Sequence, residues 1–233
     1  MRRVRSAAST GSRSRTTSST APTRTPRRSA RSRSGSAEAP IAAPRLILAS
    51  ASPRRRDILD RLGVAFEVVV PDVAEVRSGD PGVVVLENAR RKAHAGRAEA
   101  GGEGLALGVD TDVALDGRLL GKPDDERGAR ERLETLSGRT HEVLSGVVLL
   151  DTAIGSEIPV ERSATARTEV TFNELDQATI DLYLASGEWR DRAGAYAIQG
   201  LGSILVAGLH GDFSNVVGLP VTLLLQLAPN LIE

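Results

Sequence analysis

The order of strands and helices is the sequence feature that most constrains the fold of this chain. Over 44–233, apolar runs typical of strands and stretches typical of helices follow one another without a regular β-α-β repeat. Residues 45–50 predict a buried strand that leads into a helix over 53–62. By contrast, 143–151 and 161–172 predict two long neighbouring strands, which we expect to pair antiparallel. This mixture favours an α/β body with one mixed sheet over a doubly wound parallel fold.

Local signals place the other elements. Ser52 suits a helix N-cap, Asp176 suits another, and Asp116-Gly117 is typical of a hairpin turn. The body shows no internal repeat and no long linker, so we predict one domain over 44–233. The remaining expected elements are strands over 66–70 and 105–114, helices over 83–100, 125–137 and 176–186, two Gly-rich segments over 193–202 and 211–220, and a closing helix from about Pro220.

The first 43 residues differ sharply from this body. They contain ten Arg, no Lys and one acid, Glu38, and have almost no large apolar residue. Such a composition buries too little surface to offset chain entropy, so we expect a disordered basic tail. It is typical of a nucleic-acid arm or an organelle transit peptide, but a dispensable tail or an early start codon explains it more simply.

The charge of the chain divides at the same boundary. Of 30 basic and 30 acidic residues, 20 basic and 29 acidic remain after the tail is removed. A body this acidic is poorly suited to non-specific nucleic-acid binding, so a polyanion would need a local basic site. The chain has no cysteine and no apolar run of membrane-spanning length, which favours a cytoplasmic protein without disulfides, thiolate metal sites or membrane contact.

A phosphate-binding pattern lies in 50–56, Ser-Ala-Ser-Pro-Arg-Arg-Arg. It places a strand end, a tight turn and a helix N-terminus in succession, where free N–H groups and the helix dipole favour an anion. Arg54 and Arg55 add donors that suit phosphate oxygens. A cluster of solvated Arg side chains is the alternative.

Lysine usage gives a second signal. The chain has 28 Arg and only two Lys, Lys92 in a predicted helix and Lys122 in a Gly-Lys-Pro turn. A lysine that persists against this bias indicates a position that needs a compact ammonium, although chance can also leave two.

Two acidic residues in a predicted strand give a third signal of a functional site. Asp110 and Asp112 are two apart, so they share one face of the strand. Such a pair could hold Mg²⁺ or activate water, or could simply end a strand in solvent. Glu75 on a loop is unremarkable alone, and Gln199 in a Gly-rich segment could bond a base edge. The three histidines lack the spacing of a zinc site, so we interpret them as structural.

Together these segments resemble the Maf family. The matching stretches cover nearly all of 44–233, in family order and at family-like spacings. They are Leu48-Ala-Ser-Ala-Ser-Pro-Arg-Arg55, Glu75, Lys92-Ala93, Gly108-Val-Asp-Thr111, Gly121-Lys-Pro123, Leu136-Ser-Gly138 with His141, Gly194-Ala-Tyr-Ala-Ile-Gln-Gly200, and 211–220.

The resemblance implies a two-lobed fold with a central cleft, akin to inosine triphosphate pyrophosphatases. It implies hydrolysis of a nucleoside triphosphate to the monophosphate and pyrophosphate with a divalent cation, Mg²⁺ or Mn²⁺. By residue, it implies that Asp110 is the catalytic base and that Glu75 and Asp110 bind the metal. It further implies that phosphates contact Ser52, Arg54, Lys92 and Lys122, and that nucleotide choice involves Arg55, Thr111 and Gln199.

Specific residues bear on the substrate. The Asp110-Thr111 pair is similar to the branch of the family that prefers dTTP and UTP. Departures from the family pattern are Val109 for a small residue, Asp112 for an apolar one and Arg192 for Lys. Three other readings remain open: a house-cleaning hydrolase of damaged purine nucleotides, a non-catalytic regulator of septum formation, and a nucleic-acid protein that uses the tail. The oligomeric state also stays open, a homodimer included.

Overall fold

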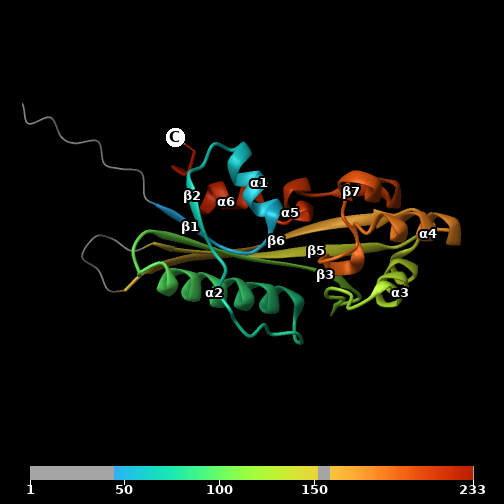
Figure 1. Cartoon of the computed structure of the whole chain (residues 1–233), viewed down its shortest axis with the longest axis horizontal. Helices are drawn as coiled ribbons and strands as arrows, with labels where there is room; N and C mark the ends of the chain where they lie inside the picture. The colour runs from blue at the N-terminus through green and yellow to red at the C-terminus, as the bar shows by residue number, and fades with distance from the viewer. Residues whose placement is uncertain (1–44, 152–157, 233) are drawn as a thin grey trace, which may run out of the picture. The chain divides into compact units, whose positions relative to one another are not determined.

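The computed structural model describes residues 45–151 and 158–232. The predictions for the basic tail therefore lie outside the described residues. Within these residues, seven strands form one sheet in the order β2-β1-β3-β5-β6-β7, with β4 paired to β3 (Figure 1). The strands are β1 (Leu46–Ala49), β2 (Phe66–Val69), β3 (Leu105–Leu115), β4 (Arg118–Leu119), β5 (Thr140–Asp151), β6 (Val160–Phe172) and β7 (Val206–His210).

The sheet is mixed, as the order of elements predicted. Strand β1 runs parallel to both β2 and β3, with Leu46 opposite Phe66 and Leu105. The pairs β3–β5, β5–β6 and β6–β7 are antiparallel, and β3 also forms a hairpin with β4. The turn of this hairpin has Asp116 and Gly117 at φ 50° and 73°, which confirms the predicted turn.

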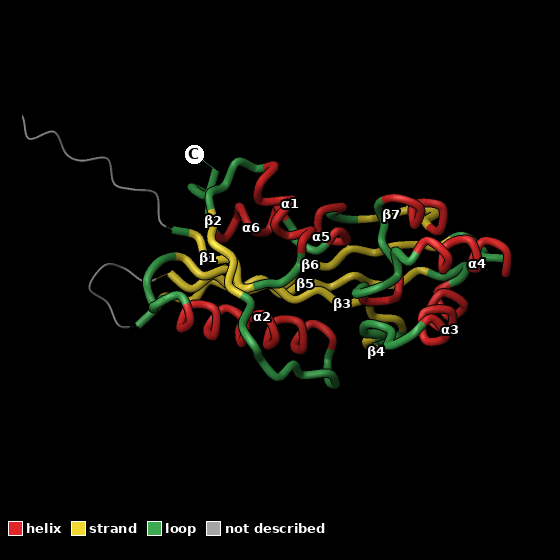
Figure 2. Tube along the Cα trace, in the orientation of Figure 1, coloured by secondary structure: helices red, strands yellow, loops and turns green. Residues whose placement is uncertain are grey.

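Helices cover both faces of the sheet (Figure 2). Helix α2 (Pro81–Glu99) packs on one face against β3 and β5. Helices α1 (Pro53–Arg61), α5 (Phe213–Val217) and α6 (Val221–Leu227) lie over the other face. None of the helices in the described part of the chain has the length and apolarity needed to cross a membrane.

Successive side chains of strand β3 point alternately into the cores on the two faces of the sheet. Leu107 and Val109 join the core under α1 and α6, whereas Ala106 joins the core under α2. Gly108 lies so close to α2 that an added Cβ would stand 2.1 Å from the Ala89 carbonyl oxygen. Alternation therefore places Asp110 on the α2 face and Thr111 on the α1 face of the same strand.

A second core lies at the other end of the long strands. It joins residues of β3, β5 and β6, such as Val113 and Phe172, to buried residues of the covering helices. Those helices are α3 (Glu126–Leu136), α4 (Gln177–Ser186) and the 3₁₀ segments η1 (Ala193–Ala195) and η2 (Gly200–Leu205). Two sets of helices thus cover the two ends of β3, β5 and β6, in agreement with the two-lobed fold that the resemblance implied.

Several expected boundaries were wrong. Helix α2 begins at Pro81 because Asp80 caps it, accepting a hydrogen bond from the Val83 N–H. Strand β7 lies between the two Gly-rich segments, and α5 forms inside the second of them. Ser52 does occupy the N-cap position of α1, but its side chain makes no capping hydrogen bond.

Candidate active site

Asp110 is the centre of a polar cluster between β3 and α2. One carboxylate oxygen accepts a hydrogen bond from Lys92 Nζ at 2.6 Å, and the other accepts one from Asn88 Nδ2 at 3.2 Å. Asn88 and Lys92 are one helical turn apart, so both reach the same spot from α2. The Asp110 side chain keeps 15% of its surface exposed, which leaves it accessible to a small molecule such as water.

Lys92 also joins Glu75 to this cluster. Its ammonium lies 2.6 Å from a Glu75 carboxylate oxygen, so one cation bridges the carboxylates of Glu75 and Asp110. Asn88 fixes the loop beside Glu75, because it accepts from the Val76 N–H and donates to the Val76 carbonyl. The predicted metal-binding pair is therefore brought together.

The predicted arginine cluster divides into different roles. Arg55 is buried, and its guanidinium donates to the Gly218 carbonyl, Ser50 Oγ and Thr111 Oγ1 at 2.8, 2.9 and 3.1 Å. Burial lowers the pKa of Arg55 to about 10, and the nearby Asp110 charge partly opposes that shift. Arg55 thus ties three segments together with donors that we expected to serve a ligand.

Arg54 instead lines a pocket on the surface of the protein. Its Nε donates to the Val217 carbonyl at 3.2 Å, and burial lowers its pKa although Asp191 acts in the opposite direction. Since the Ser52 side chain does not cap α1, the first N–H groups of the helix are not satisfied by it. Arg54 and this helix N-terminus therefore suit an anion together.

Lys122 lies on a tightly held turn across from them. The Gly121 N–H donates to Asp112 Oδ1 at 3.1 Å, and the Gly121 carbonyl accepts from the Gly194 N–H. The Lys122 carbonyl accepts from Arg132. Among the residues that the structure describes, the Lys122 ammonium has no ion-pair partner within 4.0 Å, so its charge is available to a ligand.

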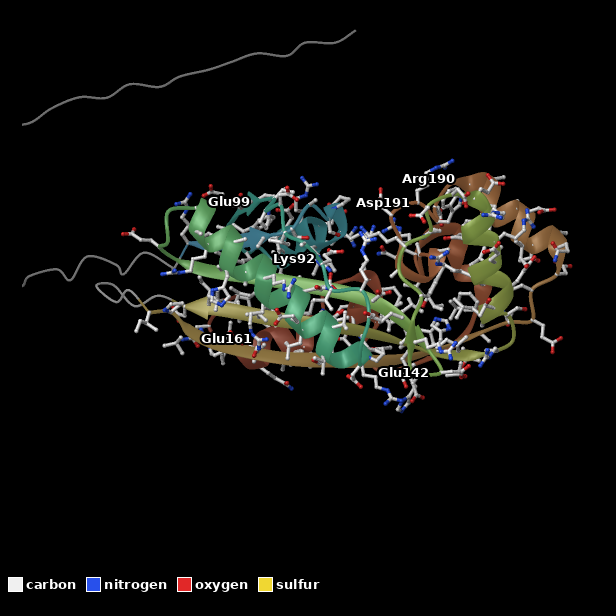
Figure 3. The ribbon with its side chains drawn as sticks, turned by 90° about the horizontal axis from the view of Figure 1, so that it is seen from below. Lys92, Glu99, Glu142, Glu161, Arg190 and Asp191 are labelled. Carbon is white, nitrogen blue, oxygen red and sulfur yellow. The ribbon has the colours of Figure 1, made fainter. Side chains whose placement is uncertain are left out.

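One pocket collects these side chains. Eight of the nine predicted site residues line it, and Glu75 contacts it through Lys92. A neighbouring hollow of about 320 Å³ extends the space along Arg54, Lys92, Lys122 and Asp191. Lys92 reaches the site from α2 and Asp191 from the segment after α4 (Figure 3). The eight lining residues are Ser52, Arg54, Arg55, Lys92, Asp110, Thr111, Lys122 and Gln199.

Other residues at the site carried little or no signal in the sequence. Asn88 is buried at the cluster, and only its spacing of four from Lys92 could have indicated it. Asp191 has φ 57°, a left-handed conformation that is uncommon for residues other than glycine, and it lines the same pocket as Arg54. Tyr196 lines the pocket from the Gly-rich segment in which the sequence singled out only Gln199 as a site residue.

Asp112 shares the face of Asp110 but not its contacts. Its Oδ1 accepts from its neighbour Val113 N–H at 2.7 Å and from the Gly121 N–H. Burial raises the pKa of Asp112 to about 6, in part offset by these two hydrogen bonds. Asp112 therefore holds the Lys122 turn.

The donor set suits a hard divalent cation. Among the described residues, no three His, Cys, Asp or Glu side chains cluster as a site made of protein ligands alone would require. Mg²⁺ in nucleotide enzymes, however, needs only one or two carboxylates when substrate phosphates complete its coordination. Glu75 and Asp110, which already share one cation, fit that smaller requirement.

Comparison with known proteins identifies the family of this chain. The family model for Maf-like proteins matches residues 45–231. The chain belongs to the Maf family. A relative from Bacillus cereus named dTTP/UTP pyrophosphatase is 45% identical over 186 residues, which cover 78% of this chain and 87% of the relative. One of the same name from Bacillus cytotoxicus is also 45% identical, with 93% of its length covered.

A solved structure gives a weaker match. The Staphylococcus aureus Ham1 protein aligns over 56% of this chain and 72% of its own, with 13% identity and a TM-score of 0.40. This likeness is too low to add to the fold described above. The Maf assignment rests on the family model and on the curated relatives, and it confirms the resemblance that the motifs indicated.

A buried histidine beside the Maf site predicts a pH effect on stability. His141 is 1% exposed, its Nε2 lies 2.8 Å from the Tyr196 hydroxyl, and burial lowers its pKa to about 4. Because the unfolded chain then binds the proton more tightly, His141 contributes stability above about pH 6.5 that is lost as the pH falls toward 4. We expect the wild type to lose about 2 kcal/mol from this group between about pH 7 and pH 4.5.

Urea unfolding of wild type and His141→Gln at both pH values measures this effect. Glutamine stays neutral, so the variant should lose less stability on acidification than the wild type. Asp112 acts in the opposite direction in the same range, but it is present in both proteins and cancels in the difference. An equal acid loss in the two proteins would show that His141 is not the titrating group.

Proposed function

We propose that this chain hydrolyses a nucleoside triphosphate, dTTP or UTP, to the monophosphate and pyrophosphate. The proposal rests on one observation: a pocket brings the carboxylate of Asp110 together with Arg54, Lys92 and Lys122. Arg54 and Lys122 suit the phosphates of a triphosphate, and a carboxylate held by Lys92 beside them suits the activation of water. The names of the Bacillus relatives support the same reaction and the same two substrates.

The triphosphate would lie along the cationic side of the pocket. Arg54, Lys122 and the N-terminus of α1 would hold phosphate oxygens, with Ser52 beside them. Asp110 would accept the proton of a water that attacks in line, and Lys122 would stabilise charge on the departing pyrophosphate. Catalysis by such a site comes mainly from positioning and charge stabilisation.

Lys92 and Asn88 keep the carboxylate in place. Each bonds one oxygen of Asp110, so the orientation of the carboxylate is fixed before substrate binds. Glu75 and Asp110 would hold the divalent cation, Mg²⁺ or Mn²⁺, which when bound neutralises phosphate charge. Thr111 and Arg55, which are bonded to each other, and Gln199 would shape the space for the nucleoside.

A substrate panel tests the proposal. Pyrophosphate release by the full chain would be followed with UTP, dTTP, CTP, ITP, XTP and 7-methyl-GTP, each with Mg²⁺ or Mn²⁺. We expect UTP and dTTP to be the best substrates. Release from ITP or XTP alone would favour an enzyme for damaged purine nucleotides, and no release by folded protein would leave a binding function.

A further inference from the structure

The segment that carries Gln199 is held from outside the pocket by two side chains. Glu188 follows α4, and its two carboxylate oxygens accept hydrogen bonds from the Leu201 and Gly202 N–H groups, each at 3.1 Å. Tyr183 lies within α4, and its hydroxyl accepts from the Ala197 N–H at 3.0 Å. Gln199 therefore lies between two anchored points, two residues from each.

The backbone of this segment packs closely against Glu188 and Ala197. Gly200 has φ 66°, and a Cβ added there would stand 2.5 Å from Glu188 Oε1. A Cβ added at Gly202 would stand 1.9 Å from the Ala197 carbonyl oxygen. Glycine at both positions lets the chain bend sharply just after Gln199 and lets the Glu188 carboxylate approach.

These contacts are stronger than those of an ordinary surface loop. A carboxylate that accepts two N–H groups forms charge-assisted hydrogen bonds, which are stronger than neutral ones. Tyr183 is fully buried, so its hydroxyl is fixed by the packing of α4. Gln199 itself is exposed and lines the pocket, so the rigidity of its position comes from its neighbours.

We infer that Glu188 and Tyr183 are positioning residues that set nucleobase selectivity by fixing Gln199 at the rim of the pocket. This inference rests on the proposed function, in which Gln199 faces the nucleoside. The anchors fix the backbone at Gln199, and the position of that backbone decides which edge of the base the side-chain amide can reach. Uracil and cytosine differ in such an edge.

The test compares full-length wild type with Glu188→Gln and Tyr183→Phe. Each variant keeps the shape of the side chain and removes one acceptor from the segment. We expect the preference for UTP over CTP in kcat/KM to fall about five- to tenfold, the effect of one misplaced hydrogen bond. Hydrolysis of ribose 5-triphosphate, which has no base, should stay unchanged. Asp181→Asn, also on α4 but paired with Arg130 away from the pocket, is the control.

A second comparison separates positioning from general damage. In a Gln199→Ala background, Glu188→Gln should have almost no further effect on selectivity, because the group that it positions is gone. An equal loss for UTP, CTP and ribose 5-triphosphate, a loss that persists without Gln199, or a wild type without preference would each overturn the inference. UTP and CTP affinities from calorimetry give the same comparison if the proposed turnover itself fails.

Discussion

Asp110→Asn is expected to lower kcat for pyrophosphate release by about 10²- to 10⁴-fold, the usual contribution of a positioned general base. Asparagine keeps the shape of Asp110 but only one acceptor oxygen, which can stay with Lys92, while its NH2 group faces the Asn88 donor. It cannot accept the proton of the attacking water. Nucleotide affinity should therefore change much less than turnover. Steady-state kinetics with UTP, together with calorimetric titration of UTP, measure the two quantities separately.

Asp112→Asn is the matched control for that variant. The two aspartates lie on the same face of β3, but Asp112 accepts only backbone N–H groups, and an asparagine oxygen can accept them equally well. We expect it to keep most of the activity. Near-full activity in Asp110→Asn, or the same large loss in both variants, would contradict the assignment of Asp110 as the base.

Gly108→Ala should destabilise the fold by about 3 kcal/mol, because overpacking against immobile atoms carries a cost of this order. The added Cβ would stand 2.1 Å from the Ala89 carbonyl oxygen and 2.6 Å from the Ala93 nitrogen, both in the backbone of α2. Helix α2 would have to move away from β3. Since α2 supplies Asn88 and Lys92, activity should fall along with stability. Thermal unfolding should show a decrease in Tm of about 10 °C.

Gly208→Ala provides the comparison for this second prediction. Gly208 is also in a strand, β7, but a Cβ added there meets no atom within 4 Å. Its Tm should stay close to that of the wild type. A similar decrease in both variants would mean that the loss of strand glycine flexibility, and not the contact with α2, determines the effect.

The sequence predicted the mixed sheet well because its signals were local. The antiparallel long strands, the Asp116-Gly117 turn and the helix that starts after Asp176 each depend on residues close together in the chain. Strand β7 was missed because it is short, includes Gly208 and has glycines close on either side. Its strand state comes from pairing with β6, which no local pattern reveals.

Most of the predicted site residues line one pocket, but their contacts could not be predicted from the sequence. Arg54 and Arg55 look equivalent in sequence and both line the pocket, yet Arg54 makes one hydrogen bond, to Val217, whereas Arg55 is buried and bonded to Gly218, Ser50 and Thr111. Asn88 bonds Asp110 across 22 residues and Val76 across 12. These long-range partners decide which polar side chain serves a ligand and which holds the framework, and sequence spacing alone cannot give them.

The most direct test of the central claim is the identity of the products that the full-length chain makes from UTP with Mg²⁺ or Mn²⁺. Phosphorus NMR of the reaction resolves every candidate product at once. If the pocket around Asp110 hydrolyses the bond between the α and β phosphates, UMP and pyrophosphate appear in equal amounts, and UDP and inorganic phosphate do not. Formation of UDP and phosphate, or an unchanged UTP spectrum in the presence of folded protein, would contradict it.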